Sequence, residues 1–306
     1  MYRRQVLKSA GTLAAGVGVR ALGVQAVATQ ASAAEAVRTR HIVTHDGTTL
    51  FHKDWGSGRP VLFVSSWGLN ADMWAYQMVA LSGPEVRCIA FDRRSHGRSS
   101  DPGRGYDYDT LADDLATVIE QLELNEITLV GHSMGAGEIV RYLSRHGPSR
   151  VARVVLLAPS TPLLLKTADN PDGVDKAVFE QMRAMWRKDF PKWLFDNARP
   201  FFVSETSTEM IQWVGAMLLQ SSLKALIDLN VQVTETDFRG ELRQVTLPTF
   251  IIHGDRDLSA PLGLTGRKTA QLIPGSRLTV YEGAPHGLMF THMERLNADL
   301  LTFVTS

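Results

Sequence analysis

Gly131-His132-Ser133-Met134-Gly135 is the stretch of this 306-residue chain that decides its fold. The apolar run Ile127-Thr128-Leu129-Val130 precedes it and predicts a buried parallel strand, and residues 136–145 after it predict a helix. A serine at a strand-to-helix turn, with glycine two positions to either side, is the nucleophile-elbow pattern. The glycines keep the turn uncrowded, because the serine takes a strained backbone conformation. The pattern therefore predicts a serine hydroxyl lifted clear of the sheet toward a partner base.

Strand-like and helix-like segments alternate on both sides of this turn. Such alternation predicts an α/β fold in which a mostly parallel central sheet is flanked by helices on both faces. Asp46-Gly47 is expected to turn a hairpin at the start of this region. The predicted segments are the hairpin 41–52, strands 61–65, 86–91, 151–157, 250–252 and 278–281, and helices 111–124 and about 293–304.

Residues 161–245 break this alternation, because they carry helical patterns and no convincing strand. We expect them to form a helical cap inserted into an α/β core made of residues 34–160 and 246–306. The predicted cap helices cover residues 177–186, 208–219 and 222–229. Of the large aromatic and methionine side chains here, most are expected to form the core of the cap and about a third to line a pocket. These side chains are Met182, Trp186, Trp193, Phe195, Trp213 and Met217.

Residues 1–33 have the composition of an export signal. Arg3-Arg4 opens the segment, a mildly apolar stretch follows, and Ala31-Ser32-Ala33 ends it with the small residues of a cleavage site after Ala33. Arg20 interrupts the apolar stretch, so no run is long enough to span a bilayer. The sequence predicts a twin-arginine signal and an exported, periplasmic protein without stable membrane insertion after cleavage.

Composition argues against several classes of partner. The 32 basic and 32 acidic residues give zero formal net charge, which favours neither nucleic acid nor an anionic membrane. The one cysteine, Cys88, lies in an apolar strand pattern and cannot form an internal disulfide. His253 and Asp257 have the spacing of metal ligands, but the rest of a ligand set is not evident. We therefore expect no metal and no cofactor.

A nucleophilic serine needs a base that removes its proton and a third group that orients this base. His286 follows the last predicted strand, in the loop Gly283-Ala284-Pro285-His286-Gly287. Asp255 and Asp257 follow the preceding strand, at the carboxyl end where parallel sheets hold functional groups. Position alone does not choose between these two aspartates. The chain order serine, aspartate, histidine is the order of the α/β-hydrolases.

Four stretches carry a family resemblance that covers nearly all of residues 34–306. The chain resembles the α/β-hydrolase family of bacterial aryl esterases and cofactor-free haloperoxidases. In that family the acid lies three residues after the glycine of a His-Gly pair, so the resemblance implies Ser133 as nucleophile, Asp257 as orienting acid and His286 as base. The four stretches are Gly131-His132-Ser133-Met134-Gly135, Phe91-Asp92-Arg93-Arg94-Ser95-His96-Gly97-Arg98-Ser99, His253-Gly254-Asp255-Arg256-Asp257 and Gly283-Ala284-Pro285-His286-Gly287.

The resemblance also implies an oxyanion hole formed by the backbone N–H groups of Trp67 and Met134. Two positions depart from the family. Ser65-Ser66 stands where the family has a His-Gly pair, and Ser95 stands where it has glycine. Glycine reaches backbone conformations that serine adopts less readily. The shape of the loop at Ser66 is therefore the open question of this site.

The resemblance implies a serine hydrolase that cleaves small aryl or alkyl carboxylic esters through an acyl-enzyme. Formation of a peracid and oxidation of halide would be a side activity of the same acyl-enzyme. The triad could instead open lactones or γ-lactams, and some proteins of this fold only bind ligands. All three triad residues are present, which favours an enzyme. The expected partner is a small-molecule ester, and homo-oligomerisation is left open.

Overall fold

A single mixed sheet forms the centre of the computed structural model, which describes residues 41–306, so the predicted export signal lies outside the described residues. The strand order is β1-β2-β4-β3-β5-β6-β7-β8. The β1–β2 and β2–β4 pairs are antiparallel, and the remaining neighbours are parallel. The strands are β1 (His41–Val43), β2 (Thr49–Gly56), β3 (Arg59–Val64), β4 (Val86–Phe91), β5 (Ile127–His132), β6 (Val151–Leu157), β7 (Thr249–Gly254) and β8 (Arg277–Tyr281).

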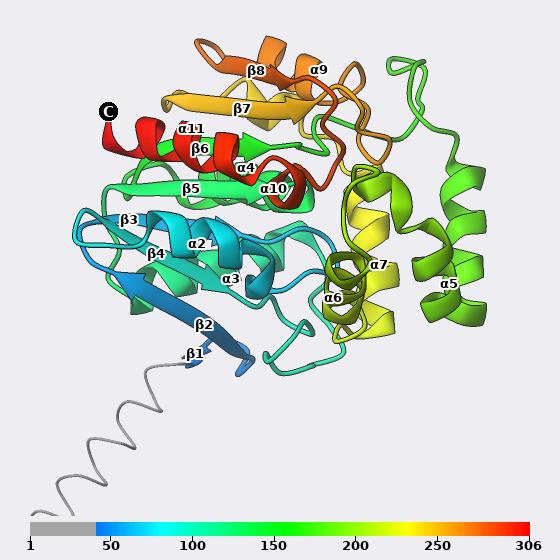
Figure 1. Cartoon of the computed structure of the whole chain (residues 1–306), viewed down its shortest axis with the longest axis horizontal. Helices are drawn as coiled ribbons and strands as arrows, with labels where there is room; N and C mark the ends of the chain where they lie inside the picture. The colour runs from blue at the N-terminus through cyan, green and yellow to red at the C-terminus, as the bar shows by residue number, and fades with distance from the viewer. Residues whose placement is uncertain (1–40) are drawn as a thin grey trace, which may run out of the picture. The chain divides into compact units, whose positions relative to one another are not determined.

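The parallel strands read as apolar runs because helices cover both faces of the sheet. Neighbouring side chains of one strand enter opposite cores: Phe63 of β3 packs on one face and Leu62 on the other. Figure 1 shows α2 and α11 in front of the sheet and α3 and α4 behind it. The predicted α/β architecture is confirmed. The helices of this core are η1 (Ala71–Trp74), α2 (Ala75–Leu81), α3 (Tyr108–Gln121), α4 (Met134–His146), α8 (Arg239–Leu242), α9 (Gly266–Leu272), α10 (Leu288–Thr291) and α11 (Met293–Thr305).

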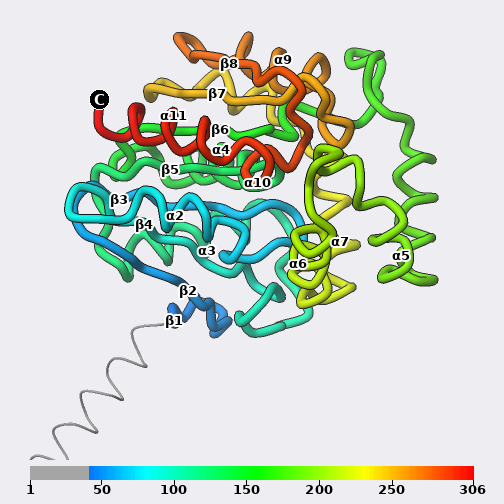
Figure 2. Tube along the Cα trace, in the orientation of Figure 1, coloured from blue at the N-terminus to red at the C-terminus, as the bar shows by residue number. Residues whose placement is uncertain are grey.

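A helical insertion lies between β6 and β7. It contains α5 (Lys176–Asn197), η2 (Arg199–Phe201), α6 (Thr208–Leu218) and α7 (Leu223–Glu235). Figures 1 and 2 show α5, α6 and α7 together beyond the carboxyl ends of the parallel strands, which is the edge where α/β sheets hold their functional groups. We call the segment from α5 to α7 the cap.

Helix α5 continues eleven residues beyond the predicted end at residue 186, after a kink. Asp189 has non-helical φ and ψ angles there, and Pro191 follows two residues later. The Asp189 carboxylate accepts the N–H of Lys192 at 3.0 Å, as an N-cap does. Proline is tolerated in the first turn of a helix, so Asp189 starts a second helical piece after the kink.

Length and hydropathy decide whether a helix of residues 41–306 could span a membrane. No single helix of this part is long and apolar enough to cross a bilayer, and only α6 with α7, bent by 95°, passes the test as a pair.

The two glycines of the elbow let the start of α4 approach two backbone segments. A Cβ on Gly135 would lie 2.5 Å from the Val64 carbonyl oxygen and 2.8 Å from that of Ser65. A Cβ on Gly131 would lie 2.6 Å from the Gly135 carbonyl oxygen. The predicted requirement for glycine is therefore steric, and α4 is held against the end of β3.

We expect Gly135→Ala to lower the free energy of unfolding by about 1–3 kcal/mol, because its methyl group overpacks fixed backbone atoms. Gly240→Ala is the matched control, since a Cβ there meets nothing within 4 Å in the short helix α8. Alanine favours a helix over glycine by about 1 kcal/mol, so this control should be neutral or stabilising. Denaturant unfolding of both variants measures the difference, and equal stability of Gly135→Ala and wild type would contradict the steric argument.

Candidate active site

Ser133 occupies the turn between β5 and α4 in the predicted conformation. Its φ of 54° and ψ of −113° lie in a region that side chains rarely adopt. Its backbone N–H donates to the carbonyl of Leu157 on β6 at 2.9 Å, which ties the turn to the sheet. The residue is 7% exposed, and it lines a cavity beneath the cap. Packing and backbone hydrogen bonds thus maintain the strained conformation of Ser133.

His286 and Asp257 meet at the edge of the same cavity. His286 Nδ1 donates to Asp257 Oδ2 at 2.6 Å, and both residues are buried. A carboxylate only accepts hydrogen bonds, so the proton of a neutral His286 sits on Nδ1 and Nε2 carries the free lone pair. His286 lines the cavity together with Ser133. This arrangement suits a base that faces a hydroxyl nucleophile.

The Asp257 carboxylate is held in its charged form. The backbone N–H groups of Ser259 and Ala260 donate to Oδ1 at 2.9 and 2.7 Å, and His253 Nε2 lies 3.1 Å from Oδ2. Burial raises the pKa of Asp257, but the charge and hydrogen bond of His286 and the contact with His253 outweigh burial. The pKa therefore lies well below its usual range.

Asp255, the alternative acid, does not reach His286. It is exposed, and its Oδ1 accepts the backbone N–H of Gly283 at 2.8 Å. Asp255 therefore fastens the loop that carries His286. The structure brings Asp257, and not Asp255, to the imidazole.

His132, the last residue of β5, stabilises the loop that carries His286. Its Nε2 lies 2.9 Å from the His286 carbonyl oxygen, and the two rings are 4.6 Å apart between centroids. Burial lowers the pKa of His132 far below its ordinary value, so the ring is neutral and donates Nε2–H to that carbonyl. His132 thus positions the main chain of His286.

The backbone N–H groups of Trp67 and Met134 are both available to a ligand. Met134 begins α4, where the helix itself supplies no acceptor. No described residue accepts a hydrogen bond from the N–H of Trp67, which lines the cavity with Ser133. The predicted oxyanion donors are thus present beside the predicted nucleophile.

The Ser65-Ser66 departure leaves the loop intact. Among the described residues with positive φ, the one in this loop is Gly68, at 72°, and Ser66 is not one of them. The buried Arg93 guanidinium donates to the carbonyls of Ser65 at 2.8 Å and Ser66 at 3.2 Å. The loop is therefore fixed through main-chain oxygens, which serine supplies as well as glycine.

Ser95 takes a left-handed conformation at the position where the family has glycine. Its φ is 62°, and its hydroxyl donates to Asp101 at 2.6 Å. Its carbonyl accepts the N–H of Ser222, just before α7, at 2.9 Å. Ser95 does not line the cavity, and its carbonyl joins this loop of the core to the residue before α7.

The cavity has a volume of about 530 Å³ and a largely apolar wall. Trp67 stacks on Trp186 of α5 with 4.7 Å between ring centroids, and Trp186 contacts Trp193 at 5.0 Å. Of the six cap side chains expected mainly in a core, Met182, Trp186 and Trp193 line this cavity, Trp213 and Met217 pack in the core, and Phe195 is 46% exposed. The cap therefore gives more of its large side chains to the cavity than expected.

Sequence reasoning missed the polar part of the wall. Ser160, Asn230 and Thr234 line the cavity as well. The available signal was Asn230 at helical spacing from Leu226 and Val233, a polar residue within an apolar face. The predicted helix ended at residue 229 and left it out.

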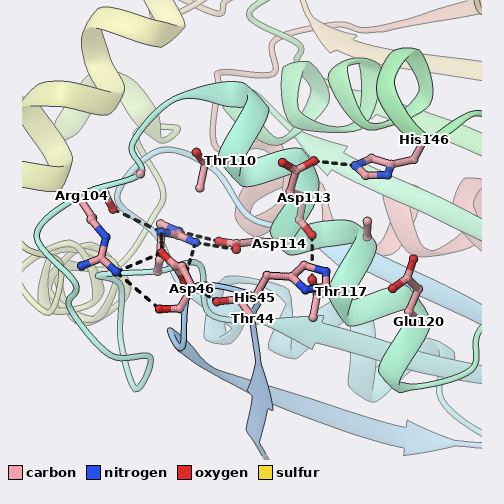
Figure 3. Close-up of a pocket in the computed structure, with 13 residues that line it drawn as sticks. Thr44, His45, Asp46, Arg104, Thr110, Asp113, Asp114, Thr117, Glu120 and His146 are labelled. Atoms are coloured by element: carbon pink, nitrogen blue, oxygen red, sulfur yellow. Dashed lines mark hydrogen bonds and ion pairs between the residues drawn. The ribbon is translucent and has the colours of Figure 1, made fainter.

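A second hollow, of about 490 Å³, lies between the β1–β2 turn and α3. Figure 3 shows several of its charged side chains paired with one another: Asp113 bonds His146 at 2.8 Å, and Asp46 lies beside Arg104. None of the predicted catalytic residues lines it. Within residues 41–306, no group of three or more His, Cys, Asp or Glu side chains is placed to hold a metal ion.

Comparison with known proteins agrees with this geometry. The sequence matches the model of the alpha/beta hydrolase fold family over residues 59–293. It is 40% identical over 268 residues to a non-heme chloroperoxidase of Kitasatospora aureofaciens, which covers 85% of this chain and 98% of the relative. It is 36% identical over 275 residues to a bifunctional esterase/perhydrolase of Acinetobacter calcoaceticus, with 87% and 99% covered.

Two solved structures are similar along the same region. A bromoperoxidase from Bacillus anthracis superposes with a TM-score of 0.83 at 35% identity, and an esterase from Exiguobacterium antarcticum with 0.84 at 32%. Each alignment covers 87% of this chain and 99% of the other. This chain therefore belongs to the α/β-hydrolase family, within its group of non-heme haloperoxidases, esterases and perhydrolases, and is a serine hydrolase.

Proposed function

We propose that the protein hydrolyses small carboxylic esters with Ser133 as nucleophile, His286 as base and Asp257 as the acid that orients it. The observation that carries this proposal is the 2.6 Å bond from His286 to a buried Asp257, at a cavity that the strained Ser133 also lines. The apolar wall suits the acyl and aryl groups of an ester, because these groups bind through burial of their apolar surface.

The reaction follows from the tautomer of His286. Ser133 Oγ attacks the ester carbonyl while Nε2 takes its proton, and Asp257 stabilises the imidazolium that forms. The N–H groups of Met134 and Trp67 donate to the oxygen that becomes negative. His286 then protonates the leaving alcohol, and the acyl group stays on Ser133. A water deprotonated by His286 attacks the acyl carbon and releases the acid.

Hydrogen peroxide can take the place of that water. Its attack on the acyl-enzyme releases a peracid and returns the proton through His286 to Ser133. The peracid then transfers its terminal oxygen to a halide ion, which gives hypohalous acid and the carboxylate. The similarity to proteins named as a non-heme chloroperoxidase and an esterase/perhydrolase supports this second outcome.

We expect Ser133→Ala to lower kcat/KM on esters by roughly 10⁴-fold or more, because no other group can form the acyl-enzyme. Aryl esters, alkyl esters, lactones and γ-lactams form the substrate panel, measured in water and again with hydrogen peroxide and bromide. Both hydrolysis and halide oxidation should disappear together in the variant. Hydrolysis that persists at the wild-type rate in a folded Ser133→Ala protein would refute the mechanism.

Asp257→Asn should lower kcat/KM by roughly 10³- to 10⁴-fold, because an amide can donate to Nδ1 and favour the wrong tautomer of His286. Asp255→Asn is the matched control. Its amide oxygen can still accept the Gly283 N–H, so activity should stay near the wild-type value. Ester hydrolysis by the two purified variants is compared, and a larger loss in Asp255→Asn would reverse the assignment.

We also propose that the folded protein is exported through the twin-arginine route. The pair Arg3-Arg4, the following apolar stretch and Ala31-Ser32-Ala33 support this, and a chain with one cysteine needs no disulfide formed after export. Replacing Arg3 and Arg4 together by lysine should retain the protein in the cytoplasm. Cell fractionation and the mass of the mature N-terminus test this, and an unchanged distribution would argue against the signal.

A further inference from the structure

One buried polar side chain of the cavity wall has an unused hydrogen-bond donor. Asn230 of α7 lines the cavity and is 8% exposed. Its Oδ1 accepts a hydrogen bond from Arg183 Nη1 of α5 at 3.1 Å. No described residue accepts a hydrogen bond from its Nδ2, and this atom is not among the fully enclosed polar atoms. The amide nitrogen is therefore left to the cavity.

Arg183 fixes which end of the amide faces the cavity. A guanidinium has donors and no acceptor, so only the oxygen of Asn230 can face it. Arg183 is 5% exposed and also contacts Thr234 Oγ1 at 3.5 Å and Glu235 Oε1 at 3.4 Å. The Glu235 carboxylate balances the buried charge, so Arg183 is anchored from two sides.

Thr234 does not compete for this role. Its hydroxyl donates to the Asn230 carbonyl at 2.8 Å, and its oxygen faces Arg183. The hydroxyl proton is thus already used within α7. In this part of the wall, Asn230 Nδ2 is the donor that a ligand can reach.

The donor lies about one helical turn from the point where α7 contacts Trp67. Trp67 Nε1 donates to the Leu226 carbonyl at 2.8 Å, which holds α7 against the loop of the predicted oxyanion hole. Asn230 follows Leu226 by one helical turn, about 6 Å along the axis. Ser133, Trp67 and Asn230 all line the same cavity. An acyl group held on Ser133 therefore shares one cavity with the Asn230 amide.

We propose that Asn230 forms a subsite for acyl groups that carry an oxygen acceptor, as an ether, ketone or hydroxyl. This inference rests on the proposed esterase function, because it concerns the acyl group that Ser133 would hold. A purely alkyl chain would displace water from Nδ2 and leave a buried donor unpaired. A site built to hydrogen-bond a substrate group discriminates against the analogue that lacks it.

Matched pairs of aryl esters test the subsite. Each pair has the same phenol and acyl length and differs by one CH₂ replaced with an ether oxygen, at the third, fourth or fifth acyl atom. The readout is the ratio of kcat/KM for the oxygen ester to that for the alkyl ester. Comparing ratios between proteins cancels the intrinsic reactivity of each ester.

We expect Asn230→Leu to lower this ratio about tenfold at the oxygen position that wild type prefers, as for the loss of one hydrogen bond. Asn230→Asp keeps an acceptor for Arg183 but presents an oxygen to the cavity, so its ratio should fall as well. Asn197→Leu is the control, because Asn197 also lines the cavity but is exposed, and its amide donates one N–H to the Trp193 carbonyl at 2.7 Å. Its ratio should match wild type.

The outcomes separate the two proposals. If hydrolysis depends on Ser133 but Asn230→Leu and Asn230→Asp keep the wild-type ratio at every oxygen position, the subsite is refuted and the esterase proposal stands. If hydrolysis of both members of each pair does not depend on Ser133, the esterase proposal itself fails. Thermal unfolding confirms that the variants are folded, and Asn230→Asp serves alone if Asn230→Leu does not fold.

Discussion

The buried ion pair between Arg93 and Glu138 connects the two halves of the site. Arg93 Nε donates to Glu138 of α4 at 2.8 Å, while its other nitrogens hold the carbonyls of Ser65 and Ser66. Helix α4 begins at the residue after Ser133, and the loop 65–68 carries Trp67. Removal of one partner of such a pair leaves an uncompensated buried charge, at a cost of about 3–5 kcal/mol. The distance between the two oxyanion donors therefore depends on this pair.

Two parts of the chain contribute different components of the site. The sheet and its loops supply rigid groups, since Ser133, Asp257 and His286 each follow a strand end. Main-chain N–H groups hold Ser133 and Asp257 in place, and the His132 ring holds the His286 carbonyl. The cap supplies the wall, through aromatic side chains of α5 and the polar face of α7. Chemistry common to a family can thus stay constant while the cap changes what the cavity accepts.

The sequence predicted the parts of this structure that local patterns encode. Apolar runs located the strands, and the glycines at 131 and 135 located the strained serine, because both are consequences of packing close to the chain itself. Asp257 could be chosen over Asp255 only through family resemblance, since both follow one strand. The contact between Arg183 and Asn230 joins α5 to α7 across 47 residues. Local sequence patterns do not predict this contact, because it depends on how α5 and α7 pack against each other.

The Ser65-Ser66 departure shows why a changed motif can leave a site in place. The constraint on this loop acts on main-chain oxygens through Arg93 and on the Trp67 indole through the Leu226 carbonyl. Neither contact involves the side chains of residues 65 and 66. The residue of this loop with a left-handed backbone conformation is Gly68. A substitution that preserves the backbone therefore preserves the donor geometry. Its effect is confined to the cavity, where Ser66 itself forms part of the wall.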